Sequence, residues 1–582
     1  MTSFLNVETS LTGRRWIGPS SEIERHAAAI AQQTGVSELL GRVLARRNVS
    51  IDGATAFLAP SLRDLMPDPS SLLDMDAAAE RFIHAIQNNQ RIAIFADYDV
   101  DGATSATLLI DWLRAKGKNA TLYIPDRIDE GYGPNIPAME ALATNHDLIV
   151  CVDCGTLSHE PIASAIAKGA DVIVLDHHLG GETLPPAHAV VNPNRQDETS
   201  DLTYLCAAGV VFLMLVAANR LLRIAGETCP DLLSMLDLVA LGTVADVAPL
   251  QGLNRALVRQ GLTVMAARKR PGMVALSDVA GMKSAPNTYH LGFLLGPRVN
   301  AGGRVGQADT GARLLATTDP AEAAKLAELL NHLNSERRAI EAEVLEAARA
   351  QAETRDVTGP LVWAAGDGWH PGVVGIVASR LKEAFNRPAV VIGTDGPEGK
   401  GSGRSVNGID LGAAVAACTR EGVLLKGGGH KMAAGLSIAT DRIEEAMTRL
   451  SEMLDRQGAS AIGPKDLTLD GLVTAGGATT DLITAVEAAG PFGAGAPAPR
   501  FAFAAMRIAF AKVAGENHLR LTLADDTGKL DAIAFNAFDS EIGHRLENHS
   551  GALFHVAGRL EIDHWGGRQK AKLRVEDVAE IL

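Results

Sequence analysis

The stretch RIAIFADYDVDG, residues 91–102, joins a run of apolar residues to a cluster of acidic ones and a glycine. ATLYIPD, DLIVCVD and DVIVLD have the same form, because each is a short apolar run that ends in an aspartate. The intervening segments, among them 103–116 and 162–168, are helix-like. Strands that are apolar throughout and alternate with helices are typical of a parallel sheet covered on both faces. In such sheets ligands bind beyond the carboxyl ends of the strands, where these aspartates fall.

Three aspartates alternate in ADYDVDG: Asp97, Asp99 and Asp101. A single aspartate after a strand is best explained as a helix cap. Residues two apart in an extended segment share a face, so at least two of these carboxylates converge. Like charges that close are unfavourable, and a bound cation removes the repulsion. Gly102 lets the chain turn tightly into the following helix.

Three further motifs place acidic or imidazole groups at the ends of expected elements. They are Asp153 in VDCG, Asp176, His177 and His178 after DVIVL, and Asp246 in LGTVADVAPL. Each is weak evidence alone, but together they supply several carboxylates and one or two imidazoles. Oxygen-rich ligation suits Mg²⁺ or Mn²⁺, and imidazole shifts the preference toward Mn²⁺. Two such ions about 3.5–4 Å apart can activate water and stabilise both oxygens of an in-line displacement.

The size and charge of the chain set limits on this hypothesis. The chain has 582 residues, so three or four domains are expected rather than one core. Its net charge of -15 has two explanations: an ordinary acidic surface, or acids that serve as metal ligands while basic residues gather elsewhere. Net charge alone does not decide between these two explanations, so the decision rests on the sequence motifs.

Cysteine usage and hydropathy indicate a cytoplasmic protein. The five cysteines are an odd number in a large chain, which argues against a disulfide framework. Cys151 and Cys154 form a C-x-x-C within a strand-like run. Residues three apart on a strand face opposite sides, so we expect neither a redox pair nor a zinc site there. The N-terminus lacks the apolar core of a signal peptide, and the apolar run 205–218 is too short to span a bilayer and reads as a buried helix.

The rest of the chain falls into segments with different sequence patterns. Residues 194–356 read as mainly helical, and one long helix begins where Asp319 can cap it, with Pro320 in its first turn and Glu322 three residues after the cap. Residues 357–455 return to an α/β pattern. The segments HLRLTLAD, KLDAIAF, ALFHVAGRLE and KAKLRVEDV then alternate as short strands, which suits a small barrel such as an OB-fold.

Taken together, the four acidic motifs resemble those of the DHH phosphoesterase superfamily. Their spacing, with the later elements, is similar to that of the RecJ single-stranded-DNA exonucleases, from about residue 50 to the C-terminus. The resemblance implies an α/β fold, with two α/β domains (DHH and DHH-associated) joined by a long helix and followed by an all-β OB-fold barrel. We expect an N-terminal helical and irregular segment over 1–80, the DHH domain over 81–318 and the connecting helix over 319–356. The DHH-associated nucleic-acid-binding domain is then expected over 357–460 and the OB-fold-like domain over 461–582.

The resemblance also implies roles for the acidic motifs. The implied metal ligands are Asp99, Asp101, Asp153, His177 and Asp246, with Asp153 bridging two ions of Mn²⁺ or Mg²⁺. These residues and His178, which would face the scissile phosphate, form the expected catalytic set. Asp97 is a further candidate ligand, and Asp176 either binds metal or orients its neighbours. Cys154 departs from the D-N-G motif of many relatives, and cysteine lacks the hydrogen bonds of an amide.

Arginine- and glycine-rich motifs downstream are expected to contact substrate. Guanidinium groups match phosphate geometry bidentately, and glycines before a helix expose backbone N–H groups to an anion. A polar loop is the alternative explanation for GPRVNAGGR, and a simple turn for the glycine triplet 427–429. The expected substrate contacts are Arg127, Arg298, Asn300, Arg304, His370, Ser402, Arg404, Gly428, Gly429 and His430. Candidates in the terminal barrel, left unranked, are Arg520, Phe535, Trp565, Arg568 and Lys570.

The activity that the resemblance implies is metal-dependent 5′-to-3′ hydrolysis of single-stranded DNA to 5′-mononucleotides in recombination and repair. The partners it implies are single-stranded DNA, a single-stranded-DNA-binding protein and a RecQ-type helicase, with the enzyme a monomer. One alternative is a phosphodiesterase of very short oligonucleotides or cyclic dinucleotides, against which the barrel argues. Another is an inactive DNA-binding scaffold, against which the complete acidic set argues.

Overall fold

The computed structural model describes residues 3–126, 130–355, 357–463, 465–564 and 568–581, which divide into two compact units. Unit 1 consists of Met1–Met66, Pro249–Ala256 and Pro464–Leu582, and unit 2 of Pro67–Ala248 and Leu257–Gly463. Unit 2 contains two sheets, and we call the part before residue 356 its first lobe and residues 357–463 its second lobe.

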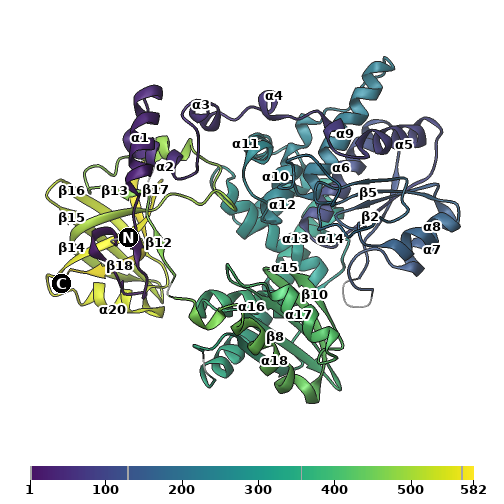
Figure 1. Ribbon diagram of the computed structural model, residues 1–582. Coiled ribbons are helices and arrows are strands. Elements are labelled where there is room, and N and C mark those ends of the chain that lie inside the picture. Colours follow the sequence, from purple (N-terminus) through teal and green to yellow (C-terminus); the bar gives the residue numbers. More distant parts are fainter. Residues whose placement is uncertain (1–2, 127–129, 356, 464, 565–567, 582) are drawn as a thin grey trace. The chain divides into compact units, whose positions relative to one another are not determined.

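The first lobe is built on a parallel sheet whose strands have the order β3-β2-β4-β5-β6. Strands β2 and β5 of this sheet are labelled in Figure 1. This arrangement confirms the strands expected from the apolar runs. Helices α7 and α8 pack on one face around Met139 and Ile162, while α5, α6 and α9 lie together elsewhere in the lobe, where the rings of Phe82 and Trp112 meet. The bounds are β2 Ile92–Ala96, β3 Ala120–Tyr123, β4 Leu148–Val152, β5 Asp171–Leu175, β6 Ala189–Val191, α5 Met75–Gln87, α6 Val100–Ala115, α7 Ile136–Asn145, α8 His159–Ala167 and α9 Ala207–Ile224.

Helix α9 is long and apolar enough to cross a membrane by length and composition, yet 72% of it is buried inside the protein. It packs against α5 and α6 as a core helix, as the sequence predicts. A series of helices follows it: α10 Leu236–Ala245, α11 Gly252–Ala266, α12 Pro271–Val279, the π-helix η4 His290–Leu295, α13 Gly296–Val305, α14 Thr310–Ala316 and α15 Pro320–Glu353. Asp319 caps the long α15 by accepting a hydrogen bond from the Ala321 N–H, and α15 packs on both lobes.

The second lobe has a mixed sheet of order β10-β11-β9-β8-β7. Strands β7 and β8 are parallel and the other neighbours are antiparallel. Helix α16 packs with α15 on one face of the sheet, and α17 and α18 cover the other. The bounds are β7 Val362–Asp367, α16 Pro371–Phe385, β8 Ala389–Asp395, β9 Glu398–Arg404, α17 Leu411–Arg420, β10 Lys426–His430, β11 Ala433–Ala439 and α18 Ile443–Asp455.

Unit 1 contains the expected C-terminal barrel, closed because β14 pairs with both β15 and β17. Its core is completed by the N-terminal helices α1 and α2, since Ile30 and Leu44 belong to the same apolar cluster as Phe503 and Val556. The sequence did not predict this association. The bounds are β1 Trp16–Ile17, α1 Ser21–Thr34, α2 Glu38–Ala45, α3 Ala54–Leu58, α4 Leu62–Leu65, β12 Leu467–Thr468, β13 Gly471–Leu472, α19 Thr480–Glu487, β14 Phe501–Ala514, β15 His518–Asp525, β16 Gly528–Ala534, α20 Glu541–Glu547, β17 Leu553–Asp563 and β18 Lys570–Glu580.

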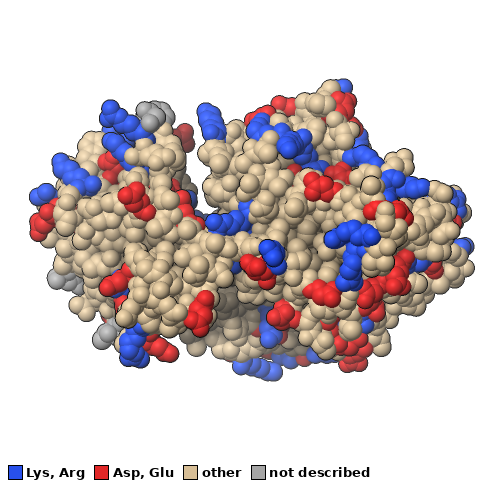
Figure 2. All heavy atoms as spheres, turned by 90° about the horizontal axis from the view of Figure 1, so that it is seen from above, with Lys and Arg blue, Asp and Glu red and all other residues tan. Residues whose placement is uncertain are grey.

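Charged side chains of both signs are interspersed on the surface seen in Figure 2. Many form ion pairs with each other, as Arg220 does with Asp68 and Asp76. A polyanion therefore meets no continuous basic field on this face, and its recognition has to come from local constellations of donors.

Candidate metal centre and strand-binding face

The first lobe brings the predicted acidic motifs together at one edge of its sheet. Asp97 directly follows β2, Asp153 follows β4, and Asp176 follows β5. These three strands are neighbours, and β2 lies between β3 and β4. The chain therefore first moves to one side of β2, where it forms β3, and then crosses to the other side, where it forms β4. Such a reversal opens a crevice at the carboxyl ends of the strands, which is where α/β proteins bind ligands.

The segment Asp97–Gly102, which we call the metal loop, has a closely specified shape. Asp99 caps α6, accepting hydrogen bonds from the N–H groups of Asp101 and Gly102 at 2.8 and 3.1 Å. Both carboxylate oxygens of the buried Asp101 accept from N–H groups at the start of α9, at 2.6 and 2.9 Å. A Cβ at Gly102 would lie 2.3 Å from the Asp97 carbonyl oxygen, so the turn requires glycine.

The structure groups the candidate ligands into three overlapping sets, with their ligand atoms within 4.8 Å of one another. The sets are Asp97, Asp99 and Asp153; Asp101, His177 and Asp246; and Asp153, His177 and His178. Asp153 and His177 each belong to two sets. This is the arrangement expected if Asp153 bridges two ions.

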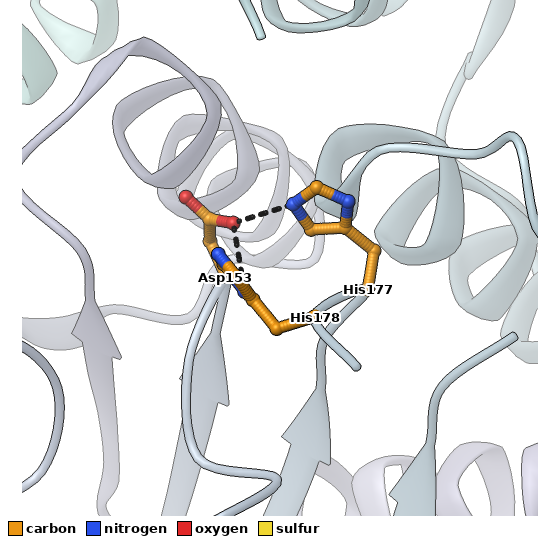
Figure 3. Close-up of side chains that lie close together, drawn as sticks. All are labelled: Asp153, His177 and His178. Atoms are coloured by element: carbon orange, nitrogen blue, oxygen red, sulfur yellow. Dashed lines mark ion pairs between the residues drawn. The ribbon is translucent and has the colours of Figure 1, made fainter. Parts of the chain in front are cut away.

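Asp153 and His177 provide the test of whether a metal fits. His177 Nε2 lies 3.2 Å from Asp153 Oδ1 (Figure 3). The same nitrogen lies 3.8 Å from both Asp101 Oδ2 and Asp246 Oδ2. Asp153 Oδ1 and His177 Nε2 are buried and have no hydrogen-bond partner among the described residues. Buried polar atoms are normally satisfied, so two that face each other across 3.2 Å fit a divalent cation between oxygen and imidazole ligands.

The electrostatics of the cluster favour the same conclusion. Burial, together with the charges of the neighbouring carboxylates, raises the pKa of Asp153 well above its usual value. Burial and the charges of Asp101 and Asp99 raise the pKa of Asp246 to about 9. Burial also raises the pKa of Asp101. Carboxylates crowded in this way hold protons until a cation replaces them.

Asp176 is engaged by hydrogen bonds, which favours the orienting role of the two that the sequence left open. Its carboxylate accepts from the N–H and hydroxyl of Thr156, from the N–H groups of His177 and His178, and from Nδ1 of His178 at 2.8 Å. Although burial opposes protonation of His178, the hydrogen bond and charge of Asp176 outweigh it and raise the pKa of His178 to about 9. The contact with Asp176 therefore favours the protonated form of the His178 ring in the metal-free protein.

Several residues that support the histidine pair were missed by the sequence analysis. Asn192 donates to the His178 carbonyl and the Thr156 hydroxyl, both at 2.8 Å, and Asn194 donates to the His177 carbonyl at 2.6 Å. Tyr132 donates to the Asp153 carbonyl at 3.1 Å and contacts the His178 ring. The only available signal was the N-x-N pattern after β6, which is common in ordinary turns.

Cys154 takes no part in the cluster of ligands. It is fully buried, and its thiol donates to the Val152 carbonyl at 3.4 Å. Burial raises its pKa, so it remains a neutral thiol. The left-handed backbone at Asp153, with φ of 60°, turns the chain here, and Gly155 follows with φ of 114°.

The motif GPRVNAGGR forms helix α13 rather than a loop. Arg298 donates to the Leu294 carbonyl at 2.7 Å and to Asn331 at 3.1 Å, Asn300 accepts from the Val100 N–H at 3.1 Å, and Arg304 donates to the Gly372 carbonyl at 2.8 Å. The remaining predicted contact from the first lobe, Arg127, lies outside the described residues.

Strand register aligns four predicted substrate contacts on one face of the second lobe. Ser402 pairs with Gly435 and Gly435 with Gly428, while Arg404 pairs with Ala433 and Ala433 with His430. Directly paired residues point to the same side of a sheet, as do residues two apart on a strand. We call the face that carries Ser402, Arg404, Gly428 and His430 the strand-binding face.

The glycine triplet 427–429 lies in strand β10, so the expectation that it precedes a helix is wrong. A Cβ at Gly428 or Gly435 would meet no atom within 4 Å, which leaves backbone open on the strand-binding face. Gly429 is different, since its left-handed φ of 153° and the close approach of Gly412 give it a packing role. At the start of α16, His370 caps the helix, and Gly375 faces Ser402 and Arg404.

The described barrel candidates lie on or next to strands β15, β16 and β18. The Phe535 ring is 47% exposed, contacts His518, and lies 5.2 Å from the Arg574 guanidinium. Arg520 lies on β15, Lys570 begins β18, and Arg568 is exposed. Trp565 lies outside the described residues.

Comparisons with known proteins agree with the geometry. Family models match as "DHH family, N-terminal domain" over residues 91–243, "DHHA1 domain" over 358–456 and "RecJ OB domain" over 469–577. The chain is 37% identical to the single-stranded-DNA-specific exonuclease RecJ of Dickeya dadantii, covering 98% of this chain and 99% of the relative. It is 34% identical to the Escherichia coli protein of that name, with 93% and 95% covered.

Solved structures give the same result. RecJ of Thermus thermophilus in complex with Mn²⁺ superimposes with a TM-score of 0.81 at 29% identity, covering 97% of this chain and 80% of that one. The complex of the same protein with Mg²⁺ gives a TM-score of 0.75 at 27% identity, with 97% and 78% covered.

Proposed function

The chain belongs to the RecJ family of single-stranded-DNA-specific exonucleases, and we infer that it is itself a metal-dependent exonuclease of single-stranded DNA. The observation that carries this inference is the pair of buried, mutually facing atoms Asp153 Oδ1 and His177 Nε2 within a cluster of carboxylates. An inactive scaffold has no need of such a cluster, which costs stability in the absence of a cation.

Mn²⁺ or Mg²⁺ bound in this cluster supplies the Lewis acidity that activates water and offsets the charge developing on the phosphodiester. We propose the ligands Asp97, Asp99, Asp101, Asp153, His177 and Asp246 for two ions, with Asp153 between them. His178 Nδ1 donates to Asp176, and we propose that Nε2, which lies 3.2 Å from the Tyr132 hydroxyl, donates to a phosphate oxygen. Asp176 thereby orients the histidine rather than binding metal.

We propose that the strand runs along the strand-binding face of the second lobe. Arg404 and Ser402 supply charged and hydroxyl donors there, and the open backbone at Gly428 allows close approach of a sugar-phosphate chain. Two neighbouring helices carry further candidates: His370 caps α16, and Arg298 and Arg304 lie in α13. Phe535 with Arg574 is the candidate stacking position on the barrel. Arg520 lies on the adjacent strand β15, where it pairs with Ile533, and Lys570 begins β18.

Polarity and products are finer proposals. We propose 5′-to-3′ degradation to 5′-mononucleotides in recombination and repair, with Arg127 holding the 5′ end. We also propose a cytoplasmic monomer that works with a single-stranded-DNA-binding protein and a RecQ-type helicase. Light scattering of the purified protein tests the monomer, and stimulation of degradation by each partner tests the association.

One nuclease assay tests the activity. A strand with a 5′-phosphate and the corresponding duplex are incubated with Mn²⁺ or Mg²⁺, beside an Asp153→Ala variant. We expect mononucleotides from the single strand alone, released first from a label at the 5′ end, and none from the variant. Equal activity of the variant would refute the assignment of the site. Cleavage of trinucleotides without cleavage of long strands would favour the short-oligonucleotide phosphodiesterase.

A further inference from the structure

Helix α13 contacts the metal loop through Asn300, a residue that the sequence analysis expected to bind substrate. Asn300 Oδ1 accepts a hydrogen bond from the Val100 N–H at 3.1 Å, across 200 residues of sequence. Val100 is the first residue of α6, and the first N–H groups of a helix have no partner within the helix. Asp99 satisfies the N–H groups of Asp101 and Gly102, so Asn300 completes the capping of this helix start.

A second contact lies one turn further along α13. A Cβ on Gly303 would lie 2.7 Å from the Tyr98 carbonyl oxygen and 3.0 Å from the Tyr98 Cβ. The helix backbone therefore lies directly against the metal loop there. Tyr98 and Val100 flank Asp99, so α13 holds the loop on both sides of this ligand.

The end of α13 is itself fixed against the second lobe. Arg304 donates from Nη1 to the Gly372 carbonyl at 2.8 Å, and a Cβ on Gly372 would lie 2.8 Å from the Arg304 carbonyl oxygen. Gly372 lies in the first turn of α16, two residues after the cap His370. Two consecutive residues of α13 thus make the two contacts: Gly303 approaches the metal loop, and Arg304 binds the second lobe.

We propose that Asn300 is a positioning residue that fixes Asp99 in the metal centre through the Val100 N–H. It acts on the ligands of the metal rather than on the strand. The role of Asp99 as a ligand rests on the proposed function, whereas the contact itself does not. Partners that orient metal ligands are known to change metal affinity or activity by about 10–100-fold when they are removed.

Two substitutions separate this role from a strand contact. Asn300→Leu keeps the size of the side chain but removes the acceptor, and Asn300→Asp keeps an acceptor oxygen in the same place. Mn²⁺ binding to the full-length protein is measured without DNA, by calorimetry and by the paramagnetic signal of free Mn²⁺, and kcat and KM are measured on single-stranded DNA. Thermal unfolding in the presence of EDTA reports whether each variant is folded.

We expect Asn300→Leu to weaken Mn²⁺ binding and to lower kcat, each by about 10-fold or more, while KM for DNA changes little. Asn300→Asp should recover most of the Mn²⁺ affinity. Unchanged Mn²⁺ affinity with a raised KM in Asn300→Leu, and a further rise in Asn300→Asp from repulsion of the phosphates, would overturn the proposal in favour of a strand contact. Absence of Mn²⁺ binding by the wild type would instead refute the proposed function.

Discussion

At the scale of single residues, Asp153 combines a functional requirement with a cost to stability. Its carboxylate is buried among other carboxylates, and its backbone adopts a left-handed φ of 60°. Asparagine tolerates this backbone region nearly as well as aspartate. The charge can therefore be removed without disturbing the turn.

Asp153→Asn should abolish nuclease activity yet stabilise the metal-free protein. A gain of about 0.5–2 kcal/mol is typical of single stabilising substitutions, and here it comes from removing a carboxyl group whose ionised form is disfavoured by burial and by the neighbouring carboxylates. The measurement is thermal unfolding in EDTA at about pH 8, compared with the same scan in Mn²⁺, which should stabilise the wild type and not the variant. A metal-free variant less stable than the wild type would contradict this account of the repulsion.

Asp246 predicts how the metal-free protein responds to pH. Its pKa rises from 3.8 in the unfolded chain to about 9 in the fold, so between these values the folded protein keeps a proton that the unfolded chain releases. Stability then falls as pH rises through this window, by up to about 1.4 kcal/mol per pH unit for one group. Urea unfolding in EDTA from pH 6 to pH 9 should show the decline, and saturating Mn²⁺ should remove it. Asp246→Asn is the control, because an unchanged slope in that variant would assign the effect to other groups.

At the scale of elements, close helix packing sets the distances in the metal centre. Gly242 lies in α10, one turn before Asp246, and α10 packs on α6. A Cβ at this glycine would lie 2.5 Å from Thr104 Oγ1 and 2.9 Å from Asp101 Oδ1. The glycine therefore permits the approach that brings Asp246 and Asp101 to one site.

Gly242→Ala should force α10 away from α6, at a cost of about 1–3 kcal/mol in stability from overpacking. A displacement of the ligands by about 1 Å can lower kcat by about 100-fold. Circular dichroism and steady-state kinetics measure the two effects. Gly463→Ala, where the added methyl group meets no atom within 4 Å, serves as the matched control and should alter neither.

The elements show how far sequence patterns reach in this protein. Apolar runs ending in aspartate predicted β2, β4 and β5, because fully buried parallel strands leave an unmistakable local signal. Strand β14 went unrecognised, since FAFAAMRIAFAKVA is alanine-rich and alternates only weakly. The motif GPRVNAGGR was not identified as helix α13, because its glycines lower helix propensity. One of them, Gly303, approaches Tyr98, which lies far away in the sequence. The motifs predicted the candidate ligands that the structure brings together, whereas Asn192, Asn194 and Tyr132 act through contacts that only the fold creates.

At the scale of the whole molecule, the first and last segments of the chain share one core. Ala27, Ile30, Val43 and Leu44 of the N-terminal helices belong to the same cluster as the interior of the barrel. Trp16, which is fully buried, donates to the fully buried Asp577 at 2.9 Å. The compact unit that contains the barrel therefore also includes the start of the chain, which the expected domain boundary at residue 461 separates from it.

Deletion of residues 464–582 alone should yield a protein that aggregates or binds hydrophobic dyes, because residues 1–66 lose the partner that covers their apolar side chains. Deletion of both 1–66 and 464–582 should remove this tendency. Dye binding and sedimentation of the two variants provide the comparison. Equal solubility of both would show that the N-terminal helices are stable without the barrel.

The shared core also has a consequence for the order of events during synthesis. Leu44 is translated long before Phe503 and Val556, with which it packs. At about 5–20 residues per second, the N-terminal helices remain uncovered on the nascent chain for on the order of half a minute to two minutes. The residues of the metal centre, and Asn300 that positions the metal loop, have all been translated well before then. The residues of the metal centre can thus come together while the N-terminal helices are still uncovered, and the barrel closes only after β18 has been translated.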